Sequence, residues 1–193
     1  MVPRKHPIKL VYLGGGRYPP YRVIDAIKLV KYLIKANRNF EIDFINKNEH
    51  DFIENILVKE KIPQSFYKIK TIGHEAIYDE LPKYDIGLVF LEKGYWIRMS
   101  SPTKIREYLA AGLLIIGNEG ISILNRMASE SENILLLKRN GENLLFCKGE
   151  IDKLLGKVKN KDTRRHSKKL AAKYFSLEKA NEEYEKVYKL LMT

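Results

Sequence analysis

The stretch SSPTKIREYLAAGLLIIGN, residues 100–118, predicts a helix followed directly by a strand. Ser101, Pro102 and Thr103 are typical of a helix start, and Gly112 is typical of a helix end. The run LLIIGN (113–118) is apolar on both of its faces, as expected of a strand inside a parallel sheet. A second such run, DIGLVFL (85–91), precedes the stretch. The sequence here reads strand, helix, strand, which is the unit that builds parallel sheets.

The same alternation extends along the whole chain. Strands are predicted at 8–16, 40–46, 66–73, 85–91, 113–118, 133–138 and 143–148, the last two around a turn at Asn140-Gly141. Helices are predicted at about 21–36, 50–61, 74–84 (a short helix or turn), 100–112, 122–129 and from about 150 onward, with breaks near Asn160 and Ser176. The expected fold class is α/β: a Rossmann-like parallel sheet with helices on both faces, plus C-terminal helices. Such a sheet binds ligands at the carboxyl ends of its strands.

Composition sets limits on the class of protein. The chain has 193 residues, 45% of them hydrophobic, which is enough for the core of one domain. A single cysteine, Cys147, excludes a disulfide framework and a cysteine-rich zinc site. With no apolar run near 18 residues, we expect a cytoplasmic protein. The net charge of +11 indicates either an anionic partner (nucleic acid, anionic lipid or a phosphorylated small molecule) or a solvated lysine-rich surface.

The start of the helix at residues 100–112 has the chemistry of a phosphate site. We expect Ser101 to cap the helix and Pro102 to take its first position, where a missing N–H costs nothing. The backbone N–H groups that would then point outward unpaired belong to Thr103, Lys104 and Ile105. The helix dipole and the side-chain charge of Lys104 add positive potential there.

Glu107 lies one turn behind this helix start. A carboxylate in that position can accept hydrogen bonds from two vicinal sugar hydroxyls, so a ribose attached to the bound diphosphate fits it. The alternative is a plain amphipathic helix in which the cap and Glu107 are structural.

The first predicted strand ends in a glycine-rich turn, YLGGGRYPPYR (12–22). Gly15 and Gly16 let the backbone approach a ligand closely. Arg17 and Arg22 follow, and guanidinium groups bind phosphate oxygens in pairs. The turn is neither a G-x-G-x-x-G dinucleotide fingerprint nor a P-loop. A plain strand-end turn with surface arginines is the alternative.

The segment SSPTKIREYLAAGLLII resembles the family 4 glycosyltransferase pattern S-P-x-K-x-x-E-Y-L/M-A-x-G-x-P-V/I. The order around it agrees with that family: a glycine-containing first strand, LPKYDIGLVFL (81–91) one loop before the motif, and AAKYFSLEKANEEYEKVYKLL (171–191) as closing helices. Members of the family have two domains facing each other across a cleft, the GT-B arrangement. The present chain is similar to the C-terminal domain alone, which binds the nucleotide sugar.

The resemblance implies roles for particular residues. Glu107 would bind the donor ribose, and Arg17, Arg22 and Lys104 would neutralise the leaving diphosphate without a metal. A backbone group of Gly73 or His74 would contact the base. Including these, the implied substrate-binding set is Gly15, Gly16, Gly73, His74, Ser101, Pro102, Thr103, Lys104, Ile105 and Glu107. Two positions depart from the pattern, with Met99 where a first carboxylate is usual and Leu114 where proline is usual.

The function implied by the resemblance is glycosyl transfer from a nucleotide sugar such as a UDP- or GDP-sugar, with retention at the sugar carbon and no cofactor. Residues 1–193 would form one donor-binding domain, with about 150–193 crossing to a missing N-terminal, acceptor-binding domain. We therefore expect an excerpt or one subunit of a split enzyme, inactive alone. His74 with Glu75 also suggests a metal or base role, but no second ligand cluster accompanies it.

Two other functions stay open at this level. One is a domain that binds nucleotide sugar without transferring it. The other is a nucleic-acid- or anionic-surface-binding module, with nucleic acid the less favoured partner. The basic run KVKNKDTRRHSKK (157–169) could dock on an anionic membrane as a peripheral contact, or could be a solvated helix face.

Overall fold

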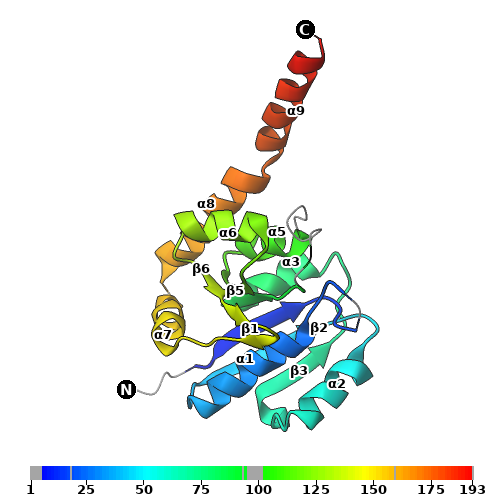
Figure 1. Ribbon diagram of the computed structural model, residues 1–193, viewed down its shortest axis with the longest axis vertical. Coiled ribbons are helices and arrows are strands. Elements are labelled where there is room, and N and C mark those ends of the chain that lie inside the picture. The colour runs from blue at the N-terminus through cyan, green and yellow to red at the C-terminus, as the bar shows by residue number, and fades with distance from the viewer. Residues whose placement is uncertain (1–5, 18, 93, 95–101, 159, 193) are drawn as a thin grey trace.

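A six-stranded parallel sheet forms the centre of the computed structural model, which describes residues 6–17, 19–92, 94, 102–158 and 160–192 (Figure 1). The strand order is β3-β2-β1-β4-β5-β6. The chain first builds outward from β1 to β3, then returns to the other side of β1 and builds outward again. The strands are β1 (Ile8–Leu13), β2 (Phe40–Ile45), β3 (Tyr67–Lys70), β4 (Ile86–Val89), β5 (Leu114–Asn118) and β6 (Ile134–Leu137).

Helices cover both faces of the sheet, because neighbouring side chains on each strand point to opposite faces. One face packs against α1 (Val23–Lys35), α2 (His50–Lys59) and α7 (Lys148–Lys157). The other packs against α3 (Ile77–Glu80), the 3-10 turn η2 (Leu81–Lys83), α5 (Thr103–Ala110), α6 (Ser122–Glu130) and α8 (Lys161–Phe175). The 3-10 turn η1 (Gln64–Phe66) precedes β3, and a small hairpin of β7 (Arg139–Asn140) and β8 (Asn143–Leu144) follows β6. The α/β, Rossmann-like prediction is confirmed.

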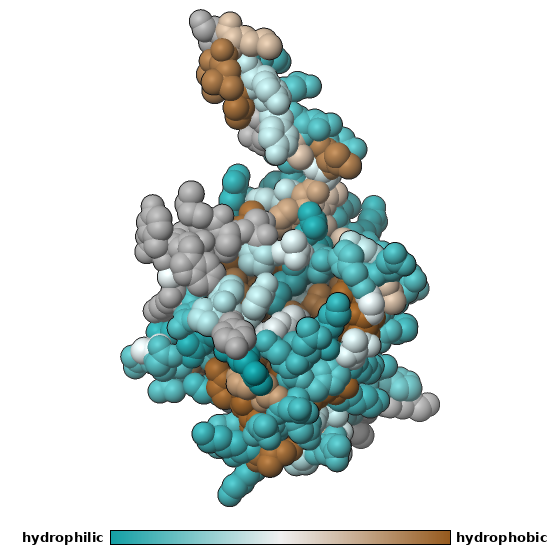
Figure 2. Space-filling view, turned by 90° about the vertical axis from the view of Figure 1, so that its right-hand side faces the viewer, coloured by the Kyte–Doolittle hydropathy of each residue, from teal (hydrophilic) through white to brown (hydrophobic). Residues whose placement is uncertain are grey.

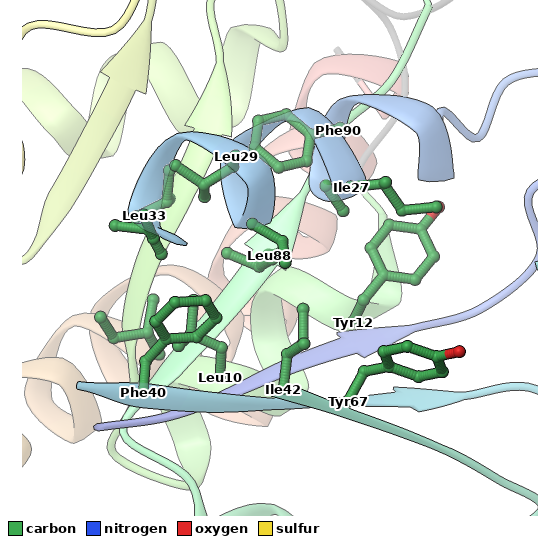
Figure 3. Close-up of a cluster of buried hydrophobic side chains, with 14 of the residues drawn as sticks. Leu10, Tyr12, Ile27, Leu29, Leu33, Phe40, Ile42, Tyr67, Leu88 and Phe90 are labelled. Atoms are coloured by element: carbon green, nitrogen blue, oxygen red, sulfur yellow. The ribbon is translucent and has the colours of Figure 1, made fainter. Parts of the chain in front are cut away.

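The α1 side of the sheet holds the larger of the two apolar clusters. Figure 3 shows Leu29 and Leu33 of α1 pointing toward Leu10, Ile42 and other side chains of the central strands. These aliphatic and aromatic side chains are almost completely removed from water. Burying each such side chain contributes about 1.5–3 kcal/mol, so this cluster stabilises the central strands.

The helix α5 lies unusually close to the middle of the sheet. A methyl group added to Gly87 of β4 would come within 2.3 Å of the ring of Tyr108. The Tyr108 hydroxyl accepts a hydrogen bond from the backbone N–H of Leu13 at 2.8 Å. Glycine in β4 therefore lets α5 approach the sheet, and the tyrosine fixes that helix against the end of β1.

The last helix, α9 (Leu177–Leu191), projects away from the body of the domain (Figure 1). Its apolar side chains are exposed, including Tyr184, Val187 and Leu191. Figure 2 shows brown, hydrophobic patches along the projecting helix. Within the described ranges, no helix is long and apolar enough to cross a membrane.

Three predicted elements differ in detail from the structure. The helix expected at 74–84 is one turn of α3 followed by η2. The strand expected at 143–148 ends at Leu144, because only the short β7 pairs with it. The C-terminal helices begin at Lys148 rather than near Glu150.

Candidate functional site

The carboxyl ends of β1 and β4 form the centre of the candidate site. The two strands are neighbours in the sheet, but the chain leaves β1 toward β2 and leaves β4 toward β5. The loops that follow them therefore diverge and open a crevice, which is where open parallel sheets bind ligands. The glycine turn follows β1, and α5 is the first described helix after β4.

The glycine turn is held in a fixed shape by its neighbours. Gly14 has φ of +122°, a conformation that side-chain-bearing residues rarely adopt. Its N–H donates to the carbonyl of Ile45 at 3.0 Å, and its carbonyl accepts from the amide side chain of Asn46 at 3.0 Å. A methyl group on Gly16 would overlap Val23 at 2.4 Å. The close approach shown for Gly16 is to Val23 of the chain itself, and close approach of this turn to a ligand stays a prediction.

A carboxylate of the chain itself occupies the N–H groups of this turn. One oxygen of Glu49 accepts hydrogen bonds from the backbone N–H of Gly16 at 2.7 Å and of Arg17 at 3.2 Å. Successive N–H groups that converge on one oxygen form an anion-binding nest. The turn therefore has the geometry to bind an anion, and Glu49 fills it in this structure. Sequence analysis missed Glu49, whose only signal was an acid one residue before a predicted helix.

A hollow of about 290 Å³ opens beside the turn. Its wall combines the glycine turn with the end of β2 and the segment after β3, and includes Gly15, Asn46, Glu49, Ile72 and Ile77. Backbone amides and apolar side chains meet in this hollow, as in sites that bind a flat polar ring.

The start of α5 differs from its prediction in two respects. Pro102, with φ of −58° and ψ of 125°, is the N-cap rather than the first helical residue, because its extended ψ lies outside the helical range. The N–H of Ile105 is not free, because it donates to the Pro102 carbonyl at 3.0 Å. Thr103 is exposed and begins the helix. The proposed cap residue Ser101 lies outside the described residues, as does Met99.

Lys104 was expected to add positive charge near the helix start, and the structure shows that its side chain is buried. The side chain is 5% exposed and runs inward beneath the glycine turn. A methyl group on Gly14 would lie 2.8 Å from its Nζ. The amine lies 4.0 Å from the ring centre of Tyr21 and 5.2 Å from that of Tyr12. The helical position explains the burial, because residue 104 is on the α5 face that packs on the sheet.

The Lys104 amine has no hydrogen-bond partner among the described residues. Burial lowers the pKa of Lys104 to about 7, and the nearby Glu107 carboxylate offsets this only in part. An unpartnered ammonium group that is almost fully buried is costly unless an anion meets it. The amine lies next to the glycine turn, so the α5 start and the turn are brought together as predicted, through the inner face of the helix.

Glu107 lines a different hollow from the one beside the glycine turn. It borders a groove of about 420 Å³ together with Tyr78 of α3, Arg106, and Phe175 and Ser176 at the end of α8. The carboxylate is partly exposed, so it is available to a ligand. Tyr78 follows Ile77, which lines the first hollow, so α3 lies between the two.

The two arginines of the turn lie apart. Arg17 stacks its guanidinium on the ring of Phe52, 5.4 Å from the ring centre. Arg22 donates to Asp25 and to Glu142, each at 2.7 Å. Burial alone would lower the pKa of Arg22, but the two carboxylates outweigh it and raise that pKa. Asp25, which is fully buried, also pairs with Arg139, so Arg22 is part of a structural network that joins α1 to the β7–β8 hairpin.

Gly73 and His74 lie after β3, next to the wall of the first hollow. Both are exposed, and the Gly73 carbonyl accepts from the N–H of Ala76 at 3.1 Å. The imidazole of His74 contacts only the ring of Tyr78, edge to face at 6.1 Å between centres, among the contacts of the described residues. In the described ranges no three His, Cys, Asp or Glu side chains gather as metal ligands would.

Comparison with known proteins identifies the fold. No protein-family model matches the chain, and no curated protein does. Solved structures match in three dimensions. TarM of S. aureus, solved with fondaparinux, alpha-GlcNAc-glycerol and UDP, gives a TM-score of 0.68 at 13% identity, covering 96% of this chain and 36% of TarM. The pneumococcal O-GlcNAc transferase GtfA, solved with UDP and GlcNAc, gives a TM-score of 0.62 at 13% identity, covering 97% of this chain and 36% of GtfA.

A shorter structure matches along almost its whole length. The catalytic domain of the cholesterol-alpha-glucosyltransferase of Helicobacter pylori gives a TM-score of 0.61 at 13% identity, covering 87% of this chain and 99% of that one. The chain spans 36% of the length of TarM and of GtfA. The chain thus has the Rossmann-like fold found in GT-B glycosyltransferases, which confirms the resemblance at that level. The narrower assignment to family 4 stays a prediction.

Proposed function

We propose that this chain binds a nucleoside-diphosphate sugar and serves as the donor half of a glycosyltransferase. The observation that carries the proposal is the buried Lys104 amine, which lies unpartnered among the described residues beside the glycine turn at the carboxyl edge of the sheet. A diphosphate is a ligand that would repay the desolvation of such a group. The fold likeness to TarM and GtfA, both solved with UDP, supports the proposal that this diphosphate belongs to a nucleotide.

In this proposal each part of the crevice has one task. The diphosphate lies between the glycine turn and the α5 start, where Lys104 and the helix dipole stabilise the charge that grows on the leaving group. The base enters the hollow lined by Ile72 and Ile77, next to Gly73 and His74. Glu107 accepts hydrogen bonds from the ribose. Arg17 binds the diphosphate once its guanidinium leaves the Phe52 ring. Arg22 binds it only if the diphosphate replaces Glu142 as the partner of this guanidinium.

The acceptor would be held by a partner domain. The exposed apolar side chains of α9 support this part of the proposal, because they are available to pack against another domain. Transfer would follow with retention and without a bound metal. The chain alone would bind the donor and transfer little.

The binding part of the proposal is tested by thermal shift with UDP and GDP. At least one of them should raise the melting temperature. Glu107→Ala should remove most of that rise, since lost hydrogen bonds to a charged group cost roughly 1.5–3 kcal/mol, about ten- to a hundredfold in affinity. Glu41→Ala, on the amino half of β2, is the matched control and should keep the full shift.

Two outcomes would contradict the proposal. If no nucleoside diphosphate changes the melting temperature while DNA or RNA binds with a steep salt dependence, the chain is a nucleic-acid module. If a nucleotide sugar binds but the chain never transfers with any acceptor-binding partner, it is a non-transferring sensor or regulatory domain.

A further inference from the structure

A basic groove lies at the amino edge of the sheet and adjoins the groove that Glu107 borders, since Lys168 and Ala172 line both. It has a volume of about 620 Å³ and runs between α8, the end of α5 and η2. Pro82, Ala111 and Ala172 give it an apolar floor. Its rim consists of five cations, namely Lys161, Arg164, Arg165, Lys168 and Lys169. Among the residues that the structure describes, no acidic side chain lines it.

Four of the five cations are available to a ligand. Arg164 is occupied, because it donates to the carbonyls of Pro82 and Tyr84 and pairs with Asp85 at 3.3 Å. The other four are exposed, and none forms an ion pair with any described residue. Other lysines nearby are neutralised, as Lys173 is by Glu130.

The arrangement of these charges is linear. Lys161, Arg165 and Lys169 follow one another at intervals of four residues, so they lie along one face of α8 over roughly 12 Å. The opposite face of α8 is fixed to the domain by Leu170 and by Ser167, whose hydroxyl accepts from the side chain of Asn133 at 2.9 Å. The row of charges is therefore rigid in the backbone and faces solvent.

We propose that this groove binds the headgroup surface of an anionic phospholipid membrane, with α8 lying along that surface. Recognition of such a surface depends on the number of nearby lysines and arginines rather than on their exact hydrogen bonds. The groove offers charge and an apolar floor. The described residues that line it include no aromatic side chain on which a base could stack. They also include no Asn, Gln, Ser or Thr side chain that could read base edges. Both features disfavour nucleic acid as the ligand. The inference does not require nucleotide binding at the proposed donor site, although the two grooves share Lys168 and Ala172.

Vesicle co-sedimentation of the 193-residue chain tests this. The protein should sediment with vesicles of phosphatidylcholine mixed with phosphatidylglycerol, and not with phosphatidylcholine alone. Each cation near the surface contributes about fivefold, so a variant with Lys161, Arg165, Lys168 and Lys169 all changed to Gln should lose more than about a hundredfold in partitioning. The Lys161→Gln/Lys169→Gln double variant should lose an intermediate amount.

A matched control separates the groove from net charge. It changes Lys35, Lys59, Lys68 and Lys148 to Gln, which are equally exposed but lie on α1, α2, β3 and α7. This control should retain most of the partitioning. Equal losses in the two quadruple variants would overturn the proposal in favour of diffuse charge. Failure of the parent chain to bind anionic vesicles, or tighter groove-dependent binding to duplex DNA or RNA, would also overturn it. Unchanged melting temperatures confirm that the variants are folded.

Discussion

At the scale of single residues, Lys104 shows how a helix position can change the meaning of a motif. In the sequence, Lys104 near a helix start predicts a charge that adds to the positive potential of a phosphate site. In the fold its amine lies beneath Gly14, between the rings of Tyr12 and Tyr21. The charge still reaches the candidate site, but from within the domain. The low dielectric there raises the free-energy cost of the unpaired charge and strengthens its attraction to a bound anion.

The burial of Lys104 predicts a pH dependence of stability. The unfolded chain keeps this proton up to about pH 10.4, whereas the folded protein releases it near 7. Between these values the unfolded state binds more protons, so this lysine makes the free energy of unfolding rise with pH, by at most about 1.4 kcal/mol per pH unit. Lys104→Met lacks this slope. Its stability advantage over the parent chain in urea unfolding should therefore be larger at pH 6.5 than at pH 9.

The exposed Lys68 supplies the control for this prediction. Lys68→Met should differ from the parent chain by the same small amount at both pH values. A constant advantage of Lys104→Met across the range would show that the amine is not desolvated.

Glu49 gives a second prediction at this scale, which depends on the proposed donor site. If the nest of Gly16 and Arg17 receives a phosphate, the Glu49 carboxylate competes for it. Glu49→Gln should tighten UDP binding, by about tenfold if one charge-assisted contact is exchanged. Isothermal titration calorimetry measures this, with Glu54→Gln on the same helix as control. Weaker UDP binding in Glu49→Gln would mean that the carboxylate only braces the turn.

At the scale of elements, the contact between α5 and β4 positions the candidate site. Gly87 allows Tyr108 to lie on the sheet, and the Tyr108 hydroxyl receives the N–H of Leu13 at the end of β1. One helix is thereby aligned with two strand ends. Displacement of α5 would move Lys104 and Glu107 together.

Gly87→Ala should therefore destabilise the domain by roughly 1–3 kcal/mol, because the added methyl overlaps the tyrosine ring and a packed core cannot expand freely. Chemical denaturation measures the change. Gly149→Ala is the matched control, since a methyl group there meets nothing within 4 Å and alanine favours its helix α7. Equal stability of the two variants would mean that the helix can shift at little cost.

At the scale of the whole molecule, the domain is a packed body with one projecting helix. All described side chains of α9 except Lys179 are exposed, so few tertiary contacts hold it. Helices of this length are marginal alone in water. Amide hydrogen exchange should therefore be fast in residues 177–191 and slow in α5 and the central strands. Protection throughout α9 in the isolated chain would indicate self-association through this helix.

The sequence predicted far more of the fold than of the site. The alternation of strands and helices located all six strands of the parallel sheet, because burial on both faces leaves an apolar run in β4 and β5 and half-burial leaves an alternating pattern in β3. The limits of the helix at 74–84 and of the strand at 143–148 were less well predicted, because short elements depend on what packs or pairs with them. For the site, the sequence found the glycine turn and the α5 segment. It missed Glu49 and the burial of Lys104, because a side chain's partners come from other elements, and it wrongly took the N–H of Ile105 as free.

What the sequence by itself determined is the layered architecture and the segments that reach the carboxyl edge, since hydrophobic periodicity and turn residues act locally. Only the tertiary structure decided which groups are free there. In the fold, Glu49 occupies the nest, and Arg22 pairs with Asp25 and Glu142. The Lys104 amine is buried without a partner among the described residues. The physical reason is that desolvation and pairing depend on distances between elements remote in the chain, which no local pattern contains.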